Sequence, residues 1–524
     1  MAGGEADGHP ADAASGGEEI TRDEPVAKLE RPFPPGDYPA LVIGSGPGGL
    51  QMSYCLRRLG IRHALLSADD SPGGMFQRFP IFQRLITWSK PHAPVDRTSE
   101  EYAWYDWNSL LADEPAHRSL APSSMDGVSY FPARHEMEAQ LAAFAERTAI
   151  QCRYGCRWEA TRSDEQGGFV LDTSDGEYHC DVAIIATGMA QPWKPTGIEG
   201  IEHVPHYVEL SAPETYRDKR VFLVGKRNSG FELADGLLPW ARQIILASPR
   251  PVRMSVLVHS SAAARARYIQ PYEDHVLGGG NMVLDAAINK IERTGSGFRV
   301  HAQGTSRPGD LLFDVDTVVA ATGFTVPLGD LRKLGVKTFF QDRLPSQTPY
   351  WESATVPGIY FAGAITQGSI GLKKYGHPSG SSAVHGFRYN ARVLARHLAE
   401  DRFGLEIERP RVQPPAAVDH LLTRATGGAD LWNQQSYLAQ VLDHLDDGTF
   451  VDAGSVPLAH FVDAYDRDAI AIAIETDATG DIHPAVYVRR GPEVSEHLLP
   501  SAHMHAYETK EHRSHLTSLL GEWI

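Results

Sequence analysis

The feature that most constrains the fold is a glycine-rich turn, Gly-Ser-Gly-Pro-Gly-Gly at residues 44–49, between an apolar run and a helical pattern. The run at residues 40–43 is typical of a buried parallel strand. Gly44 permits the tight turn, Gly46 lets a pyrophosphate approach the backbone, and Gly49 allows close packing of helix on strand. The helix N-terminus offers free amides and a positive dipole to phosphates. The sequence therefore predicts a strand-turn-helix unit that binds a dinucleotide.

A second turn of the same kind, Gly-Lys-Arg-Asn-Ser-Gly at residues 225–230, follows an apolar strand pattern at residues 221–224 and precedes a helix. Each unit is followed much later by an apolar strand that ends in Ala-Thr-Gly, at residues 182–188 and 318–323. Two matching units of this type predict two Rossmann-like domains, with the second inserted in the first.

Composition argues against several classes of function. The formal net charge of −17 and the lack of a basic stripe argue against nucleic-acid binding. No apolar run approaches the roughly 20 residues that span a bilayer, and the N-terminus lacks a signal-peptide pattern. Cys152 and Cys156 are separated by three residues rather than two, so the usual redox pair is missing. We expect a cytoplasmic protein with a small-molecule substrate and no nucleic-acid or membrane partner, and a homodimer is the assembly that we consider.

The order of motifs resembles that of class B flavin-dependent monooxygenases, which include the amine N-hydroxylases. It runs from the first glycine turn through Gly73-Gly74 and the two Ala-Thr-Gly strands, with the second glycine turn between them. A closer likeness is to bacterial relatives of the endoplasmic-reticulum flavoprotein associated with degradation. It is carried by segments such as Arg78-Phe-Pro80, Asp106-Trp-Asn-Ser-Leu-Leu111 and Val384-His-Gly-Phe-Arg-Tyr389. The resemblance implies FAD that is reduced by NAD(P)H.

The predicted fold class is α/β, with two Rossmann-like dinucleotide-binding domains and a small C-terminal α+β domain; the NAD(P)H domain is inserted in the FAD domain. The expected boundaries are residues 1–37 for a disordered acidic tail, 38–199 and 345–404 for the FAD domain, 200–344 for the NAD(P)H domain, and 405–524 for a C-terminal domain of unknown role. The tail is expected to be disordered because it has almost no large apolar side chains.

Candidate FAD ligands follow from the first unit and from the resemblance. They are Gly44, Gly46, Gly49, Ser67, Asp69, Gly74, Arg78, Thr187, Gly188 and Gly363. The second strand ends in Ser67, where such motifs usually place an acid for the ribose. Asp69 and Asp70 follow closely, and each either reaches the sugar or is a solvated turn residue. Residues 380–394 predict a helix whose first turn would aim amides at the flavin pyrimidine oxygens.

Candidate NAD(P)H ligands come from the second unit. They are Gly225, Arg227, Ser229, Gly230, Arg250, Thr322 and Gly323. Arg227 replaces the middle glycine, and with Lys226 it either clamps phosphate or is a surface basic residue on a degenerate turn. Arg250 lies just beyond the unit's second strand, where an Asp or Glu favours NAD and an Arg favours the 2'-phosphate of NADP. The sequence therefore predicts NADPH.

The candidate catalytic residues are Ser89, Lys90 and Asn228. Ser89 and Lys90 belong to an aromatic stretch, up to Trp107, that either walls the substrate pocket or packs a core. The Baeyer-Villiger pattern is broken because Val204 stands where a His is required. The resemblance then implies hydroxylation of an amine nitrogen or sulfur through a C4a-hydroperoxyflavin. Alternatives are an NAD(P)H oxidase, an electron-transfer reductase, or a flavin-bearing interaction module that docks through residues after about 405.

Overall fold

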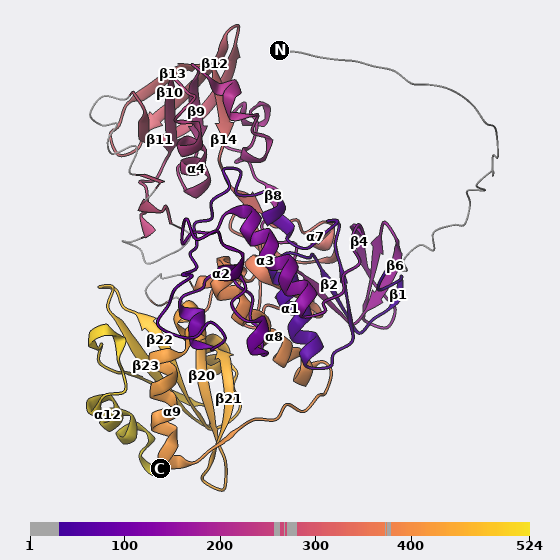
Figure 1. Cartoon of the computed structure of the whole chain (residues 1–524), viewed down its shortest axis with the longest axis vertical. Helices are drawn as coiled ribbons and strands as arrows, with labels where there is room; N and C mark the ends of the chain where they lie inside the picture. The colour runs from indigo at the N-terminus through magenta and orange to yellow at the C-terminus, as the bar shows by residue number, and fades with distance from the viewer. Residues whose placement is uncertain are drawn as a thin grey trace, which may run out of the picture.

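The computed structural model describes residues 31–255, 263–266, 268–269, 280–372, 374 and 379–523 (Figure 1). Most of the expected tail lies outside the described residues. Within it, however, β1 (Gly36–Asp37) pairs in parallel with β6 (Gly176–Cys180), and Arg31 forms an ion pair with Asp175. Order therefore begins before residue 38, because backbone pairing and an ion pair hold a segment that has little apolar surface.

The first dinucleotide domain is built on a parallel four-stranded sheet in the order β18-β7-β2-β3. Its strands are β2 (Ala40–Ile43), β3 (His63–Leu66), β7 (Val182–Ile185) and β18 (Ile359–Phe361). The strand-turn-helix expectation is confirmed by β2 and α1 (Pro47–Arg58), and α1 packs against α8 (Val384–Asp401). A long gap in sequence between the paired strands β7 and β18 holds the second domain, which confirms the predicted insertion.

Smaller elements surround this sheet. They are α2 (Ala121–Ser124), α3 (Arg134–Arg147), β4 (Trp158–Ser163), β5 (Phe169–Thr173), β8 (Gln191–Pro192), β15 (Phe324–Thr325), α7 (Leu331–Leu334), β16 (Thr338–Phe339) and β17 (Leu344–Pro345). Strands β4, β5, β6 and β1 form a sheet of their own. No helix within the described ranges is long and apolar enough to cross a membrane.

The second dinucleotide domain has a six-stranded sheet in the order β13-β12-β11-β10-β9-β14 (Figure 1). Its elements are β9 (Arg220–Val224), α4 (Asn228–Leu237), β10 (Gln243–Ser248), β11 (Met282–Thr294), β12 (Gly297–Gly304), β13 (Asp310–Val315) and β14 (Thr317–Ala320). Strands β10, β9 and β14 run parallel, as a Rossmann unit requires. The α/β fold class with two such domains is confirmed.

The C-terminal domain is an antiparallel sheet in the order β19-β21-β20-β22-β23-β24, with helices beside it (Figure 1). Its elements are β19 (Arg411–Val412), α9 (Pro414–Gly427), α10 (Ala429–Asn433), β20 (Leu438–His444), β21 (Phe450–Pro457), α11 (Leu458–Asp463), β22 (Ala469–Thr476), β23 (Ile482–Arg490), β24 (Glu493–Leu498) and α12 (Lys510–Leu520). Isoleucines and alanines alternate along β22, and the two sets lie in separate buried clusters. Both faces of this sheet are therefore covered.

One predicted helix begins later than expected. A 3-10 turn at Gly380–Ser382 precedes α8, and Ala383 between them is extended, with φ −133° and ψ 161°. Gly386 packs so closely on this turn that an added Cβ would lie 2.2 Å from the Gly380 carbonyl. Because this contact fixes a bend, the helix starts at Val384 rather than at Gly380.

Candidate dinucleotide-binding site

A cavity of about 760 Å³ lies between the two dinucleotide domains. The first domain lines it with residues 43–48, 67–69, 84–87 and 186–190, among others. From the second domain, Asn228, Ser229 and Glu232 at the start of α4 reach the same space. One continuous cavity therefore joins both glycine turns.

The first turn can pack this closely against its neighbours only because its residues are glycines. An added Cβ at Gly49 would lie 1.8 Å from the Gly44 carbonyl oxygen, and one at Gly48 would lie 2.4 Å from the Cα of Gly363. Gly46 is open, since the nearest atom to its added Cβ is the Cα of Gly74 at 3.8 Å. This open backbone over Gly46 and the free N-terminus of α1 form a cradle that fits the pyrophosphate of FAD.

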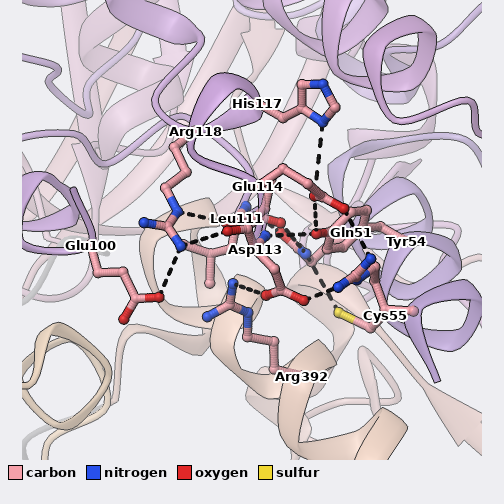
Figure 2. A network of polar contacts seen from close by, with 12 residues as sticks. Gln51, Tyr54, Cys55, Glu100, Leu111, Asp113, Glu114, His117, Arg118 and Arg392 are labelled. Carbon is pink, nitrogen blue, oxygen red and sulfur yellow. Dashed lines mark hydrogen bonds and ion pairs between the residues drawn. The ribbon is translucent and has the colours of Figure 1, made fainter. Parts of the chain in front are cut away.

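A polar network fixes α1 behind this cradle (Figure 2). Gln51 accepts a hydrogen bond from the Leu111 amide at 2.7 Å and donates one to the Leu111 carbonyl at 3.0 Å. The Tyr54 hydroxyl donates to Glu114 at 2.7 Å and accepts from the Asp113 amide at 2.6 Å. Arg392 of α8 closes the network through an ion pair with Asp113 at 3.0 Å. These contacts of Gln51 and Tyr54 therefore hold α1, whose N-terminus lies at the cavity.

Ser67 and Asp69, the two candidate ligands of the FAD ribose, differ in their hydrogen bonding. Ser67 accepts hydrogen bonds from the Ser45 hydroxyl at 2.8 Å and from the Asp69 amide at 3.2 Å. The Asp69 carboxylate lines the cavity and lies 3.9 Å from a guanidinium nitrogen of Arg78, whereas Asp70 is exposed and outside the lining. Since the Ser67 hydroxyl is already engaged, Asp69 is the better placed acceptor for sugar hydroxyls.

Three further FAD candidates also line the cavity: Thr187, Gly188 and Gly363. The Thr187 hydroxyl oxygen is buried and has no hydrogen-bond partner among the described residues. Gly188 and Gly363 have φ values of 70°, a conformation that favours glycine. An unpaired buried hydroxyl beside an open backbone is a place that a polar ligand would complete.

The second turn keeps the glycine geometry at its ends. An added Cβ at Gly225 would lie 2.4 Å from the Ala321 carbonyl oxygen, and one at Gly230 would lie 2.3 Å from the Gly225 carbonyl oxygen. Ser229 and Asn228 line the cavity. The Asn228 side-chain nitrogen donates to the Ala263 carbonyl at 3.1 Å. The Asn228 side-chain oxygen is buried without a partner in the described part of the chain. Asn228 is therefore the predicted catalytic residue that the structure brings to the cavity.

Lys226 does not do what the sequence predicted. Its side chain is buried, forms an ion pair with Asp285 and donates to the Leu284 carbonyl at 2.8 Å. The expectation that it adds positive charge at the helix entrance is wrong, because its side chain points toward Leu284 and Asp285 of β11.

Arginines supply that charge instead. Partial desolvation and the positive charges of Arg250 and Arg253 lower the pKa of Arg227. Burial and the charge of Arg227 likewise lower the pKa of Arg343. None of these four arginines forms an ion pair with a carboxylate within the described ranges. These four arginines therefore gather positive charge beside the second turn, outside the lining of the cavity.

Thr322 and Gly323 serve a supporting purpose. Thr322 donates to the Trp193 carbonyl, and Gly323, with φ 90°, packs against Arg343. Neither lines the cavity, nor do Gly225, Arg227, Gly230 or Arg250, whereas the adjacent Phe324 does.

Ser89 and Lys90 are not at the cavity. Ser89 is fully buried and donates to Asp106 at 2.5 Å, while Lys90 is exposed. Thr87, two residues earlier, lines the cavity and donates to the Asn108 side-chain oxygen at 2.5 Å. The sequence alone did not reveal which residue of this segment meets the cavity, and the structure places Thr87 there rather than Ser89.

Sequence reasoning also missed Glu232, which joins the domains. It accepts hydrogen bonds from the Tyr207 hydroxyl at 2.5 Å and from the Phe82 amide at 2.9 Å. The Phe82 ring fills the space beside Gly236, where an added Cβ would lie 2.3 Å away. The sequence feature that could have identified Glu232 is its spacing of three residues from Ser229, which places both residues on one face of α4.

All four cysteines are buried free thiols. Burial raises the pKa of Cys55 to about 11, and it also raises the pKa of Cys152 and of Cys156. These groups are therefore protonated and poor nucleophiles near neutral pH.

Comparisons with known proteins identify the family of the chain. Residues 41–363 match the pyridine nucleotide-disulphide oxidoreductase family, which is more than half of the chain. The FAD-dependent oxidoreductase domain-containing protein 2 of Mus musculus is 27% identical over 437 residues; the match covers 76% of this chain and 64%, less than two thirds, of that relative. The ferredoxin–NADP reductase of Salinispora tropica is 28% identical over 376 residues, covering 68% of this chain and 95% of that protein. A flavin-containing monooxygenase from Stenotrophomonas maltophilia shares the fold, with a TM-score of 0.52, 19% identity, and coverage of 70% of this chain and 98% of that one. The chain thus belongs to the pyridine nucleotide-disulphide oxidoreductase family.

Proposed function

We propose that the protein is an NADPH-dependent monooxygenase that hydroxylates an amine nitrogen or a sulfur atom of a small molecule. The observation that carries this proposal is the single cavity that joins both dinucleotide turns without a cysteine pair. Of the described residues that line it, one is a cysteine, Cys156, and it lies at the Ser67 end, where its amide donates to the Ser67 carbonyl at 2.8 Å. Electrons therefore leave the flavin for oxygen or an external acceptor rather than for a protein disulfide.

FAD, when bound, supplies hydride acceptance from NADPH and the activation of dioxygen. NADPH provides two electrons, one oxygen atom enters the substrate, and the other leaves as water. The chain's share is to orient both dinucleotides and to exclude water from the space between them. Rings of Phe79, Tyr207 and Phe324, with centroids 5.6 to 6.0 Å apart, form an apolar wall for that purpose.

Two groups at the cavity can hold a polar reactant in place. The Asn228 side-chain oxygen is an unused acceptor. Thr87 donates its hydroxyl proton to Asn108, so its lone pairs are available to accept a hydrogen bond from the cavity. Both groups would orient an N–H or O–H donor without adding charge.

Oxygen insertion into a ketone is less well supported. Val204 is buried where the ketone-oxidising pattern needs a His. His203 is exposed, and His206 is buried and bonded to the Gly323 carbonyl at 3.0 Å. Neither lines the cavity.

A second candidate, an electron-transfer reductase, is favoured by the likeness to the Salinispora tropica protein, whose length the match covers almost completely. The two candidates differ in the fate of the electrons. Purified holoenzyme should be given NADPH with panels of amines, sulfides and ketones, while NADPH consumption and hydrogen peroxide release are both measured. We expect at least one amine or sulfide to suppress peroxide release and appear as its hydroxylated or S-oxidised product. Complete uncoupling with every amine and sulfide, together with rapid reduction of an added one-electron acceptor, would establish the reductase instead.

A further inference from the structure

The C-terminal domain contributes a fully buried side chain to a polar cluster below the FAD site. Gln434 follows α10, and its amide nitrogen donates to the Asn390 side-chain oxygen at 2.5 Å. Its oxygen accepts from the Ser381 hydroxyl at 3.2 Å. Asn390 belongs to α8 and Ser381 to the 3-10 turn before it, so Gln434 links two segments of another domain.

The cluster continues to Gly363, the first residue of the 3-10 segment Gly363–Gly368. Asn390 donates to the Ser381 hydroxyl at 3.1 Å and to the Thr366 hydroxyl at 2.9 Å. Thr366 in turn donates to the Gly363 carbonyl at 2.7 Å. Each of the four side chains in this cluster is at most 1% exposed. Water cannot replace a lost partner there without rearrangement, so each hydrogen bond fixes its neighbour.

Both ends of the cluster meet the cavity wall. Gly363 faces Gly48 of the first glycine turn and lines the cavity with Ala364. Residues 382–384, next to Ser381, also line it. A shift of either segment would move the surface that meets FAD.

A second side chain of the C-terminal domain, Tyr437, contacts the chain next to the 3-10 segment Gly363–Gly368. The Tyr437 hydroxyl donates to the Pro349 carbonyl at 2.8 Å and shares a hydrogen bond of 2.6 Å with the Ser369 hydroxyl. Ser369 directly follows the 3-10 segment Gly363–Gly368. The C-terminal domain therefore holds this segment near both of its ends.

We infer that the C-terminal domain is a structural part of the FAD site, with Gln434 as the positioning residue that acts through Asn390 and Ser381. This role is independent of the reaction that the flavin performs. It gives the C-terminal domain a function in cofactor retention.

The test compares two buried glutamines of the same domain. Gln440 is 2% exposed, donates to Asp452 at 2.5 Å and accepts from Arg424 at 2.8 Å, all within the C-terminal domain. Holoenzymes of Gln434→Met and Gln440→Met should be compared for unfolding temperature by circular dichroism and for FAD release on dilution by flavin fluorescence. We expect both to unfold earlier than wild type, but only Gln434→Met to bind FAD about tenfold to a hundredfold more weakly. Equal FAD affinities in the two variants would overturn the inference.

Gln434→Glu gives a readout that a purely structural role would not produce. The introduced carboxylate still accepts from Ser381 but faces the acceptor oxygen of Asn390, and protonation restores a donor to that oxygen. FAD retention by this variant should therefore improve as pH falls from about 8 to about 6, while wild type changes little. A pH-independent variant that retains FAD as wild type does would overturn the inference. If neither Gln434 variant folds, Tyr437→Phe decides: it should release FAD severalfold faster, and unchanged release would count against the proposal.

Discussion

The two glycine turns have the same place in their domains but offer different groups to a phosphate. In the first turn the backbone at Gly46 is open, and the nearest facing group is another glycine, Gly74. In the second turn Arg227 stands at the corresponding position. The positive charge of Arg250 lowers the pKa of Arg227, and that of Arg227 lowers the pKa of Arg343. Neutral amides and a helix dipole hold a ligand by close fit, whereas guanidinium groups hold it by charge. The first arrangement suits a resident cofactor and the second a cosubstrate that must leave.

The largest expected effect comes from closing the first turn. Gly46→Glu places a carboxylate where the pyrophosphate would lie, so the purified variant should lose its yellow FAD almost completely. Flavin content relative to protein, from the absorbance spectrum, measures this loss. Gly46→Ala is the matched control: its Cβ would be 3.8 Å from the nearest protein atom, so the fold should be kept, and without an added charge it should lose less FAD than Gly46→Glu. A folded Gly46→Glu variant with normal flavin content would refute the site.

The next effect tests the second turn. Arg250→Ala removes one cation from the group, so the KM for NADPH should rise by about tenfold to a hundredfold, as expected for an ion pair worth about 1.5 to 3 kcal/mol. The KM for NADH, which has no 2'-phosphate, should change little. Steady-state kinetics with both cosubstrates measure the difference. If both constants rise together, Arg250 supports the fold rather than the phosphate.

Replacing Lys226 should change the stability of the fold and leave NADPH binding unchanged. Lys226→Met breaks the buried ion pair with Asp285 and should lower the free energy of unfolding by about 1 to 3 kcal/mol, with the KM for NADPH unchanged. Burial opposes ionisation of Asp285, but hydrogen bonds from Lys226 and Ser306 hold its pKa below the ordinary value. The stabilisation is thus present above the ordinary aspartate pKa and is lost as pH falls through the lowered one. Urea unfolding at several pH values checks this: a gap between wild type and variant that stays constant into the acid range would contradict the assignment.

The smallest effect is expected at the cysteines. Cys152→Ser and Cys156→Ser should leave NADPH-dependent flavin reduction and turnover at wild-type rates, since both thiols are buried and burial raises their pKa. Rapid-mixing reduction of the bound flavin measures this. Loss of electron transfer in either variant, with FAD retained, would reopen a disulfide-reductase mechanism.

Local patterns predicted the elements that depend on local interactions. The strand at residues 40–43, the glycine turn and α1 follow from apolar residues and glycines that are adjacent in sequence. What failed depended on side-chain direction in irregular segments: Thr87 rather than Ser89 faces the cavity, and Lys226 is directed into the domain. No periodicity marks such directions, because contacts with distant segments decide them.

The contribution of Gln434 to the FAD site could not be predicted from the sequence for the same reason. Its partners Asn390 and Ser381 are more than 40 residues away in the chain, and a single buried glutamine carries no motif. Sequence patterns also assigned no chemistry to residues 405–524, because the alternating strands there specify a covered sheet and nothing about which domain it supports.

The central claim is that the second turn binds its ligand by charge and therefore selects NADPH. Anaerobic rapid mixing of the wild-type holoenzyme with increasing NADPH or NADH, followed by loss of the oxidised flavin absorbance, tests it directly. The account predicts similar limiting rates for the two, with an apparent Kd for NADPH about tenfold to a hundredfold lower and weakened by added salt. Equal Kd values, or tighter binding of NADH, would contradict it.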